Sequence, residues 1–251
     1  MDRYLKRQIE LGKKLQELSK KKIMAFELKN VVPWGRNLEE YTKIFKLTDA
    51  DFNNRIISFG DGPASFNSEM AKLNKTVVSL DPIYQFTKAE LNQRIDETKE
   101  TVLEQMRTNQ EKFVWKNIKN VDELEQIRMK AMSVFIDDYE KGKEQQRYIY
   151  HELPNKTKYD TSEFDLGLSS HFLILYSQLG LDFHIKSISE MLRICKEIRI
   201  FPILNLNATK SEVLEDIITH FSTDFNVTIE SSDYEFQKDG NKMLVIKRKI
   251  N

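Results

Sequence analysis

The sequence has little cysteine and no excess of charge of either sign. Its 251 residues include a single cysteine, Cys195, so an internal disulfide cannot form and a reducing compartment is favoured. The 39 basic and 39 acidic residues cancel, which argues against a general electrostatic attraction to nucleic acid or to a membrane surface. We therefore expect a cytoplasmic protein.

Long apolar runs are also missing. Residues 1 to 25 are too charged for a signal peptide, and no apolar run reaches the roughly 20 residues of a membrane-spanning helix. Hydrophobic residues still make up 40% of the chain, which is enough for a substantial core. We expect an N-terminal helical arm over residues 1–30 and one main domain over residues 31–251.

Glycine is scarce as well, with eight residues, yet two of them lie in the most informative stretch, residues 55–82. A short apolar run ends at Phe59, and the turn Gly-Asp-Gly-Pro-Ala-Ser follows at residues 60–65. A helix-like segment and a second apolar run closed by Asp81 come next. This order predicts the first half of a doubly wound nucleotide-binding sheet. Glycine admits a close backbone approach, the helix start offers free N–H groups, and Asp81 can accept both ribose hydroxyls.

Residues 57–64 resemble the first motif of the class I S-adenosylmethionine (SAM)-dependent methyltransferases, which reads apolar-acid-apolar-Gly-x-Gly-x-Gly. Pro63, after the second glycine, is common in that family and unusual in turns that bind NAD. Two positions depart from the motif, because Ser58 occupies the acidic position and Ala64 the third glycine. The resemblance extends over about Val32 to Lys249, apart from one insertion, and it implies SAM as the cofactor.

The resemblance also implies which residues contact SAM. The glycine turn would cradle the methionine and ribose, Asp81 would hold the ribose, and the residues just past the third strand would line the adenine pocket. Arg36, upstream of the first strand, could pair its guanidinium with the methionine carboxylate, or be a surface arginine beside a packed tryptophan. The implied cofactor-binding residues are Arg36, Gly60, Asp61, Gly62, Pro63, Ala64, Asp81, Pro82, Glu152, Leu153, Ser169 and Ser170.

A second informative stretch begins at Phe164 and resembles the fourth strand of a methyltransferase, whose end faces the methyl group of SAM. Ser169, Ser170 and His171 would lie there, near the chemistry. His171 is the candidate general base, since histidine titrates near neutral pH. The alternative is that Ser170 caps a helix and His171 lies in its first turn. The Asn/Asp-Pro-Pro-aromatic motif of amino-group methyltransferases is absent, and Asp165 is expected to be structural.

A helical insertion is expected at about residues 82–145, between the second and third strands. Thr87 and Glu90 form a capping box, and two apolar stripes predict two long helices with a break near residues 115–120. The pair would cap the carboxyl edge of the sheet or form a contact between two copies of the chain.

The rest of the chain completes an α/β fold. Helices are expected at residues 38–47, 172–179 and 183–197, with Cys195 on the apolar stripe of the last one, and Thr209 is expected to cap another helix. Strands are expected at residues 148–150, 198–204, 226–234 and 243–249. The fold prediction is a doubly wound, seven-stranded, mostly parallel sheet with a C-terminal antiparallel hairpin, plus the N-terminal helix and the helical insertion.

The favoured function is a SAM-dependent methyltransferase that acts on a small-molecule acceptor. One alternative is a SAM- or nucleotide-binding protein without activity, which Ser58 favours. The other is an NAD-dependent oxidoreductase, which Asp81 allows but Pro63 and the closing hairpin oppose. Nucleic acid is a less favoured partner than a small molecule, and the sequence allows a homodimer. No metal site is expected, because His184 and His220 lack partners at metal-ligand spacing.

Overall fold

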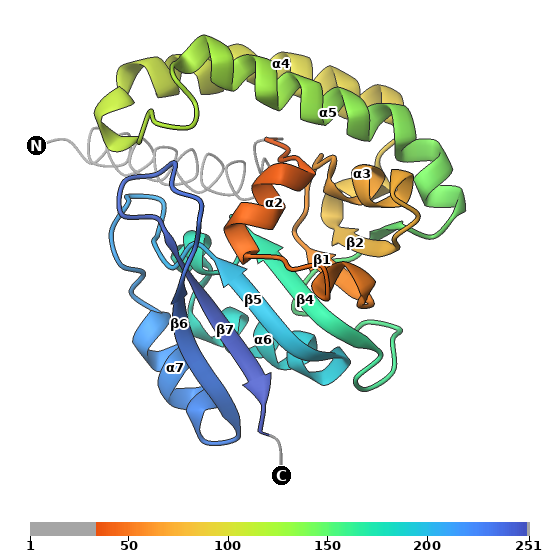
Figure 1. Ribbon diagram of the computed structural model, residues 1–251, viewed down its shortest axis with the longest axis vertical. Helices are drawn as coiled ribbons and strands as arrows, with labels where there is room; N and C mark the ends of the chain where they lie inside the picture. Colours follow the sequence, from red (N-terminus) through yellow and green to blue (C-terminus); the bar gives the residue numbers. More distant parts are fainter. Residues whose placement is uncertain (1–33, 250–251) are drawn as a thin grey trace, which may run out of the picture. The chain divides into compact units, whose positions relative to one another are not determined.

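The computed structural model describes residues 34–249, so the predicted arm at residues 1–30 lies outside the described part. A seven-stranded sheet runs through this part in the order β3-β2-β1-β4-β5-β7-β6 (Figure 1). The pairs among β1 to β5 are parallel, whereas β7 runs antiparallel to both β5 and β6. The strands are β1 (Ile56–Phe59), β2 (Val77–Asp81), β3 (Tyr148–Tyr150), β4 (Phe164–Ser170), β5 (Cys195–Phe201), β6 (Phe225–Ser231) and β7 (Lys242–Arg248).

Helices cover both faces of the sheet, as expected for central strands such as β1, in which all four residues are buried. In β1, Ile57 and Phe59 join a core with helices α6 and α7, while Ile56 joins the opposite core with α2, α3 and α5. The fold class predicted from the sequence is therefore confirmed for the described residues. The α-helices are α2 (Leu38–Phe45), α3 (Phe66–Lys72), α4 (Lys88–Thr108), α5 (Val121–Glu144), α6 (Leu181–Ile194) and α7 (Leu214–Ser222).

Short 3-10 helices shape the connections between these elements. The two that adjoin the carboxyl edge of the sheet are η2 (Pro82–Gln85), directly after β2, and η4 (Ile174–Leu179), shortly after β4. The other two are η1 (Asp51–Asn53) and η3 (Gln110–Lys112). No helix among residues 34–249 is both long enough and apolar enough to cross a bilayer.

The predicted insertion is present as α4 and α5, which lie side by side (Figure 1). The capping box of Thr87 and Glu90 starts α4, as predicted. Apolar residues of both helices, among them Leu91 and Phe135, form a third core with Tyr84 and Tyr148. The connection between the helices reaches the loop that joins β6 and β7, where Val114 donates a backbone hydrogen bond to Phe236 at 2.7 Å. The insertion is thus tied to the sheet at both ends.

Three local predictions are wrong. Helix α6 ends at Ile194, and Cys195 begins β5 opposite Phe164 of β4, because pairing within the sheet overrides the helical spacing of the apolar residues. Thr209 does not cap α7, since its hydroxyl bonds to Asn205 and α7 starts without a side-chain cap. The segment at residues 172–179 is a kinked 3-10 helix starting at Ile174. Cys195 remains a buried core residue, as expected.

Candidate functional site

The glycine turn lies at the carboxyl end of β1, where ligands of open α/β sheets bind. Gly60 and Gly62 both have left-handed backbone conformations, with φ of 69° and 55°. A Cβ on Gly62 would meet nothing within 4 Å, so its Cα faces open space and admits a ligand. A Cβ on Gly35 would lie 2.0 Å from the carbonyl oxygen of Pro63, which shows how closely the segment before α2 packs on the turn.

Asp81, at the end of β2, binds the same turn from the side. Its two carboxylate oxygens accept hydrogen bonds from the backbone N–H groups of Gly62 (2.8 Å) and Ile83 (2.9 Å). Burial raises the pKa of Asp81 to about 6, and the two backbone donors only partly oppose this shift. The predicted ribose acid is thus in contact with the glycine turn, and its carboxylate still has lone pairs available to hydroxyl groups.

The other residues of the turn point into the protein. The carboxylate of Asp61 accepts hydrogen bonds from three hydroxyl groups, those of Tyr41, Ser58 and Ser79. Ala64 is 2% exposed and packs with Phe66 in the core beneath α2 and α3. Pro63 is also buried. Ala64 therefore serves the core rather than a ligand.

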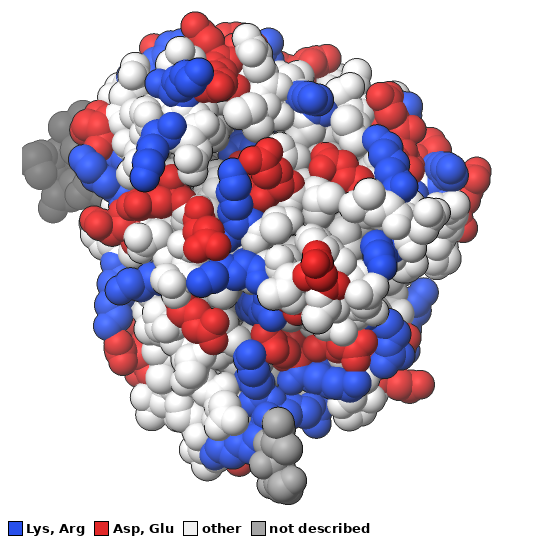
Figure 2. Space-filling view, viewed as in Figure 1, with Lys and Arg blue, Asp and Glu red and all other residues white. Residues whose placement is uncertain are grey.

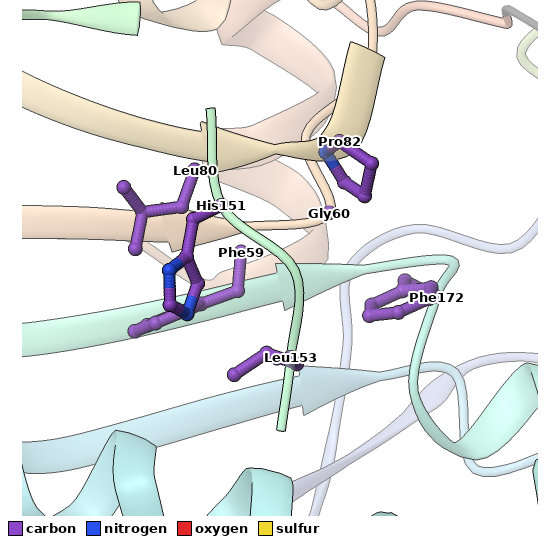
Figure 3. Close-up of a pocket in the computed structure, with 7 residues that line it drawn as sticks. All are labelled: Phe59, Gly60, Leu80, Pro82, His151, Leu153 and Phe172. Atoms are coloured by element: carbon purple, nitrogen blue, oxygen red, sulfur yellow. The ribbon is translucent and has the colours of Figure 1, made fainter. Parts of the chain in front are cut away.

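A small cavity of about 40 Å³ adjoins the turn (Figure 3). His151 and Leu153, which follow β3, and Phe172, which follows β4, surround it together with Gly60. The ring of Phe172 packs directly on the turn, because a Cβ on Gly60 would lie 2.6 Å from it. The full lining is Phe59, Gly60, Leu80, Pro82, His151, Leu153 and Phe172.

The segment after β3 meets the cavity with different residues than expected. Leu153 lines it, as the adenine-pocket prediction requires, whereas Glu152 is exposed and accepts a hydrogen bond from the Tyr150 hydroxyl at 3.1 Å. His151 lines the cavity in its place, and its buried Nε2 has no hydrogen-bond partner. Burial lowers the pKa of His151, so the ring is neutral at pH 7 and can serve as a hydrogen-bond partner.

The carboxyl end of β4 brings together the three polar residues predicted there. Ser169 is fully buried and its hydroxyl has no partner, while the Ser170 hydroxyl lies 2.8 Å from Nδ1 of His171. His171 follows the strand in a left-handed conformation with φ of 55°, so it is not the first turn of a helix. Burial lowers the pKa of His171 well below its usual range, and the nearby Arg36 and Arg128 lower it further. Its imidazole is therefore neutral at pH 7 and is a weak base, because burial and the two guanidinium groups disfavour its protonation.

Two arginines lie near this histidine. Arg128 of α5 is fully buried and bonds to Glu40 and to the Tyr234 hydroxyl. Arg36 makes one long hydrogen bond to the Trp34 carbonyl, at 3.5 Å, and its buried Nε has no partner. No carboxylate of residues 34–249 lies within salt-bridge distance of Arg36, and burial together with Arg128 lowers its pKa. Arg36 is thus a sheltered cation that can receive an anionic group.

Gly35, His151 and Phe172 were not among the site residues predicted from the sequence. Each of them contacts residues that are distant in the sequence or lines a cavity with them, and local hydrophobic periodicity does not predict such contacts. The available signal was positional, since His151 directly follows the third strand and Phe172 directly follows the predicted base.

Comparison with known proteins found distant structural similarities and one relative by sequence. No protein-family model matches the chain. Solved structures with similar folds include the PH0226 protein of Pyrococcus horikoshii, with 9% identity, a TM-score of 0.47, and coverage of 89% of this chain and 99% of that one. Another is a TehB-like SAM-dependent methyltransferase of Corynebacterium glutamicum, with 12% identity, a TM-score of 0.44, and coverage of 93% and 97%. These similarities are too distant to carry an argument about activity.

The order of the strands identifies the fold more directly. A parallel sheet that ends in an antiparallel strand inserted between the last two neighbours is the arrangement expected for the class I methyltransferase fold. The chain also has a relative by sequence. The uncharacterized protein MJ0045 of Methanocaldococcus jannaschii is 38% identical over 223 residues, which cover 88% of this chain and 98% of that protein. The chain belongs to the same protein family as MJ0045 of M. jannaschii.

Proposed function

We propose that the protein is a SAM-dependent methyltransferase acting on a small-molecule acceptor. The observation that carries this proposal is the meeting of three features at the carboxyl edge of a methyltransferase-type sheet. These are the left-handed glycine turn, the acid Asp81 bonded to it, and the cavity beside Leu153. Each corresponds to one part of the cofactor, in the order methionine, ribose and adenine.

The residues at hand suit each part of SAM. Asp81 would accept the ribose hydroxyls, Leu153 would pack on the adenine, and His151 would offer Nε2 to its polar edge. Arg36 would pair with the methionine carboxylate, which supplies the anion that this guanidinium lacks. The backbone around Gly60, Gly62, Pro82, Ser169 and Ser170 would complete the walls of the site.

Cofactor binding would include a local movement of Phe172. The cavity of about 40 Å³ has room for only a few water molecules, and the Phe172 ring covers Gly60. Adenine and ribose therefore require the ring to withdraw from the turn. Phe172 follows the end of β4, so a change of its side-chain rotamer would move the ring off Gly60 without moving the strand.

The chemistry is an in-line displacement at the methyl carbon. Bound SAM would supply a methyl group on a sulfonium, to which a lone pair of the acceptor could bond while the electrons of the carbon–sulfur bond stay on sulfur and S-adenosylhomocysteine is released. The predicted general base, His171, would accept a hydrogen bond from the acceptor group. Its lowered pKa makes it a weak base, so the released proton would pass on to solvent. Most of the rate enhancement would come from alignment of the two reactants.

A small acceptor is supported by the surroundings of the β4 end. The α4–α5 connection and the β6–β7 loop are joined by hydrogen bonds from Val114 to Phe236 (2.7 Å) and from Lys238 to Lys112 (3.0 Å). The insertion and the hairpin are therefore in direct contact at this place, which would restrict the space for a large acceptor. Figure 2 also shows basic and acidic side chains intermixed over the face in view, without the basic stripe that a nucleic-acid surface has.

Calorimetric titration with SAM, S-adenosylhomocysteine and NADH tests the proposal. We expect micromolar binding of the first two ligands and none of NADH. Binding of NADH alone would favour an oxidoreductase, and binding of no nucleotide would refute the cofactor assignment. A screen of small acceptors for S-adenosylhomocysteine release then separates an enzyme from a SAM-binding protein without turnover.

A further inference from the structure

Asp61 lies between the two glycines of the turn, and its carboxylate is surrounded by buried hydroxyl groups. Its carboxylate is 7% exposed and accepts hydrogen bonds from Tyr41 of α2, Ser58 of β1 and Ser79 of β2, the last at 2.6 Å. Three separate elements thus direct a hydroxyl group at one carboxylate. Since Asp61 lies between two glycines, its backbone belongs to the surface that would face a ligand while its side chain points away from it.

The position of this carboxylate explains the departure at Ser58. In the related motif an acid stands at this point of β1, and here a serine with no exposed surface takes its place. The hydroxyl of Ser58 donates its hydrogen bond to Asp61, so the negative charge is held next to the site of the missing acid. The acid is thus three residues later in the sequence than in the motif, but its carboxylate is in hydrogen-bond contact with the motif position.

This acid has no cationic partner among residues 34–249. No lysine or arginine of this part lies within salt-bridge distance of it, and burial raises the pKa of Asp61 while the three hydroxyl donors oppose that rise. A buried carboxylate held only by neutral donors is stabilised when a cation comes near. The methionine end of SAM brings two cations, an ammonium and a sulfonium.

We propose that Asp61 supplies the negative charge that complements the cationic amino-acid end of SAM, in place of the acid missing at position 58. This inference rests on the proposed function. Asp61 acts as a positioning residue, because hydroxyl groups occupy its oxygens and it reaches the cofactor through its field and through the turn that it holds. Ser58 is then compatible with a working site.

The test compares ligands with and without the amino-acid end. We would titrate the wild-type protein and D61N with SAM, S-adenosylhomocysteine and 5′-methylthioadenosine, which is neutral and lacks the amino acid. The expected result is that D61N binds SAM and S-adenosylhomocysteine about tenfold or more weakly and 5′-methylthioadenosine within about twofold of wild type. D96N, at an exposed aspartate of α4, is the matched control and should bind all three normally.

Relocation of the charge provides the second arm. The double variant S58D/D61N returns the acid to the motif position and should recover most of the lost SAM affinity. If D61N fails to fold, S58A replaces it, because that variant removes one donor and keeps the charge. The proposal predicts that S58A binds SAM and S-adenosylhomocysteine at least as well as wild type, whereas weaker binding of all three ligands would mean that the cluster only holds the turn.

The outcomes are distinct. An equal loss for all three ligands would reduce Asp61 to a structural role, and unchanged SAM binding by D61N would overturn the proposal outright. Failure of the wild-type protein to bind SAM would instead refute the proposed function and, with it, the ground of this inference.

Discussion

Asp81 shows how one residue can cost stability and serve a site at the same time. Its carboxylate is 5% exposed and receives only two backbone N–H groups, so its pKa rises from 3.8 to about 6. The folded protein therefore binds a proton at this position more tightly than the unfolded chain does. As the pH rises from about 4 to about 6, the folded state loses stability through this group, and the loss persists above that range.

Replacement of Asp81 by asparagine should reveal that cost. Asparagine cannot ionise, so the free energy of unfolding of D81N, relative to wild type, should rise by about 2.4 kcal/mol between pH 4 and pH 7. Urea unfolding at the two pH values measures this difference, whatever constant offset the lost hydrogen bond adds. A difference that is the same at both pH values would mean that the carboxylate is not destabilised by burial.

The affinity for SAM should also depend on the ionisation of Asp81, but it should increase as the pH rises, whereas the contribution of Asp81 to stability decreases. If the carboxylate accepts the ribose hydroxyls, wild-type affinity should fall about tenfold between pH 7 and pH 5 as Asp81 takes up a proton near pH 6. D81N should bind SAM weakly at both pH values.

The glycine turn permits a prediction with an internal control. Gly60 and Gly62 share left-handed backbones, but only at Gly60 would a Cβ meet the Phe172 ring, at 2.6 Å. G62A should therefore cost only the backbone strain of about 1–2 kcal/mol, and G60A should cost clearly more. The double variant G60A/F172A should recover part of the difference. Equal costs for the two single variants in urea unfolding would show that Phe172 does not press on the turn.

At this scale the sequence predicted residues whose chemistry is local. Gly60 and Asp81 could be found because a glycine turn and a strand-terminal acid are readable from neighbours in the chain. His151 and Phe172 could not, since their importance comes from where β3 and β4 end relative to β1. Glu152 illustrates the limit, because a shift of one residue along an exit loop exchanges an exposed acid for a cavity-lining histidine.

Among the elements, helix α5 links the insertion to the edge of the sheet. Its Arg128 is fully buried, with Glu40 of α2 on one side and Tyr234 of the β6–β7 connection on the other. The Tyr234 hydroxyl also donates to Glu40, at 3.0 Å. The strong attraction of Arg128 lowers the pKa of Glu40 despite its burial. The insertion is therefore part of the folded core and not an independent appendage.

Loss of Arg128 should destabilise the protein more than loss of the whole pair. R128M leaves Glu40 as an uncompensated buried charge and should cost about 3–5 kcal/mol in urea unfolding at pH 7. R128M/E40Q removes both charges and should be more stable than R128M. R107M, at an exposed arginine of α4, should stay within about 0.5 kcal/mol of wild type. If R128M and R128M/E40Q proved equally stable, the two charges would not be coupled.

The elements themselves were mostly predictable, and the errors have physical reasons. The paired helices of the insertion have long apolar stripes and side-chain caps, so their prediction was confirmed. The boundary between α6 and β5 was misplaced because Cys195 continues the helical spacing, and only its pairing with β4 makes it a strand residue. Helix α7 begins without a cap, and the nearest capping-box sequence, at Thr209, is engaged in a turn with Asn205.

At the scale of the whole molecule, the site joins parts of the chain that are otherwise far apart. The glycine turn, the end of β2, the exit of β3 and the end of β4 meet at one edge of the sheet (Figure 1). Buried polar contacts continue inward, from Asp61 through Ser79 to Asn67, which accepts a hydrogen bond from Arg147 at 2.6 Å. Arg147 in turn pairs with Asp138 of α5. A ligand at the turn thus contacts a region connected to both the sheet and the insertion.

Cofactor binding should therefore stabilise the molecule as a unit. A ligand present at 100 times its Kd contributes about 2.7 kcal/mol to the folded state, which corresponds to a rise in Tm of roughly 5–10 °C for a chain of this size. We expect SAM to produce such a shift at pH 7 in a single unfolding transition, because the polar contacts and the three cores connect the site to every described element. D81N should show little shift at the same SAM concentration. A SAM-dependent shift confined to one of two separate transitions would mean that the insertion unfolds independently of the sheet, against the buried links through Arg128 and Arg147.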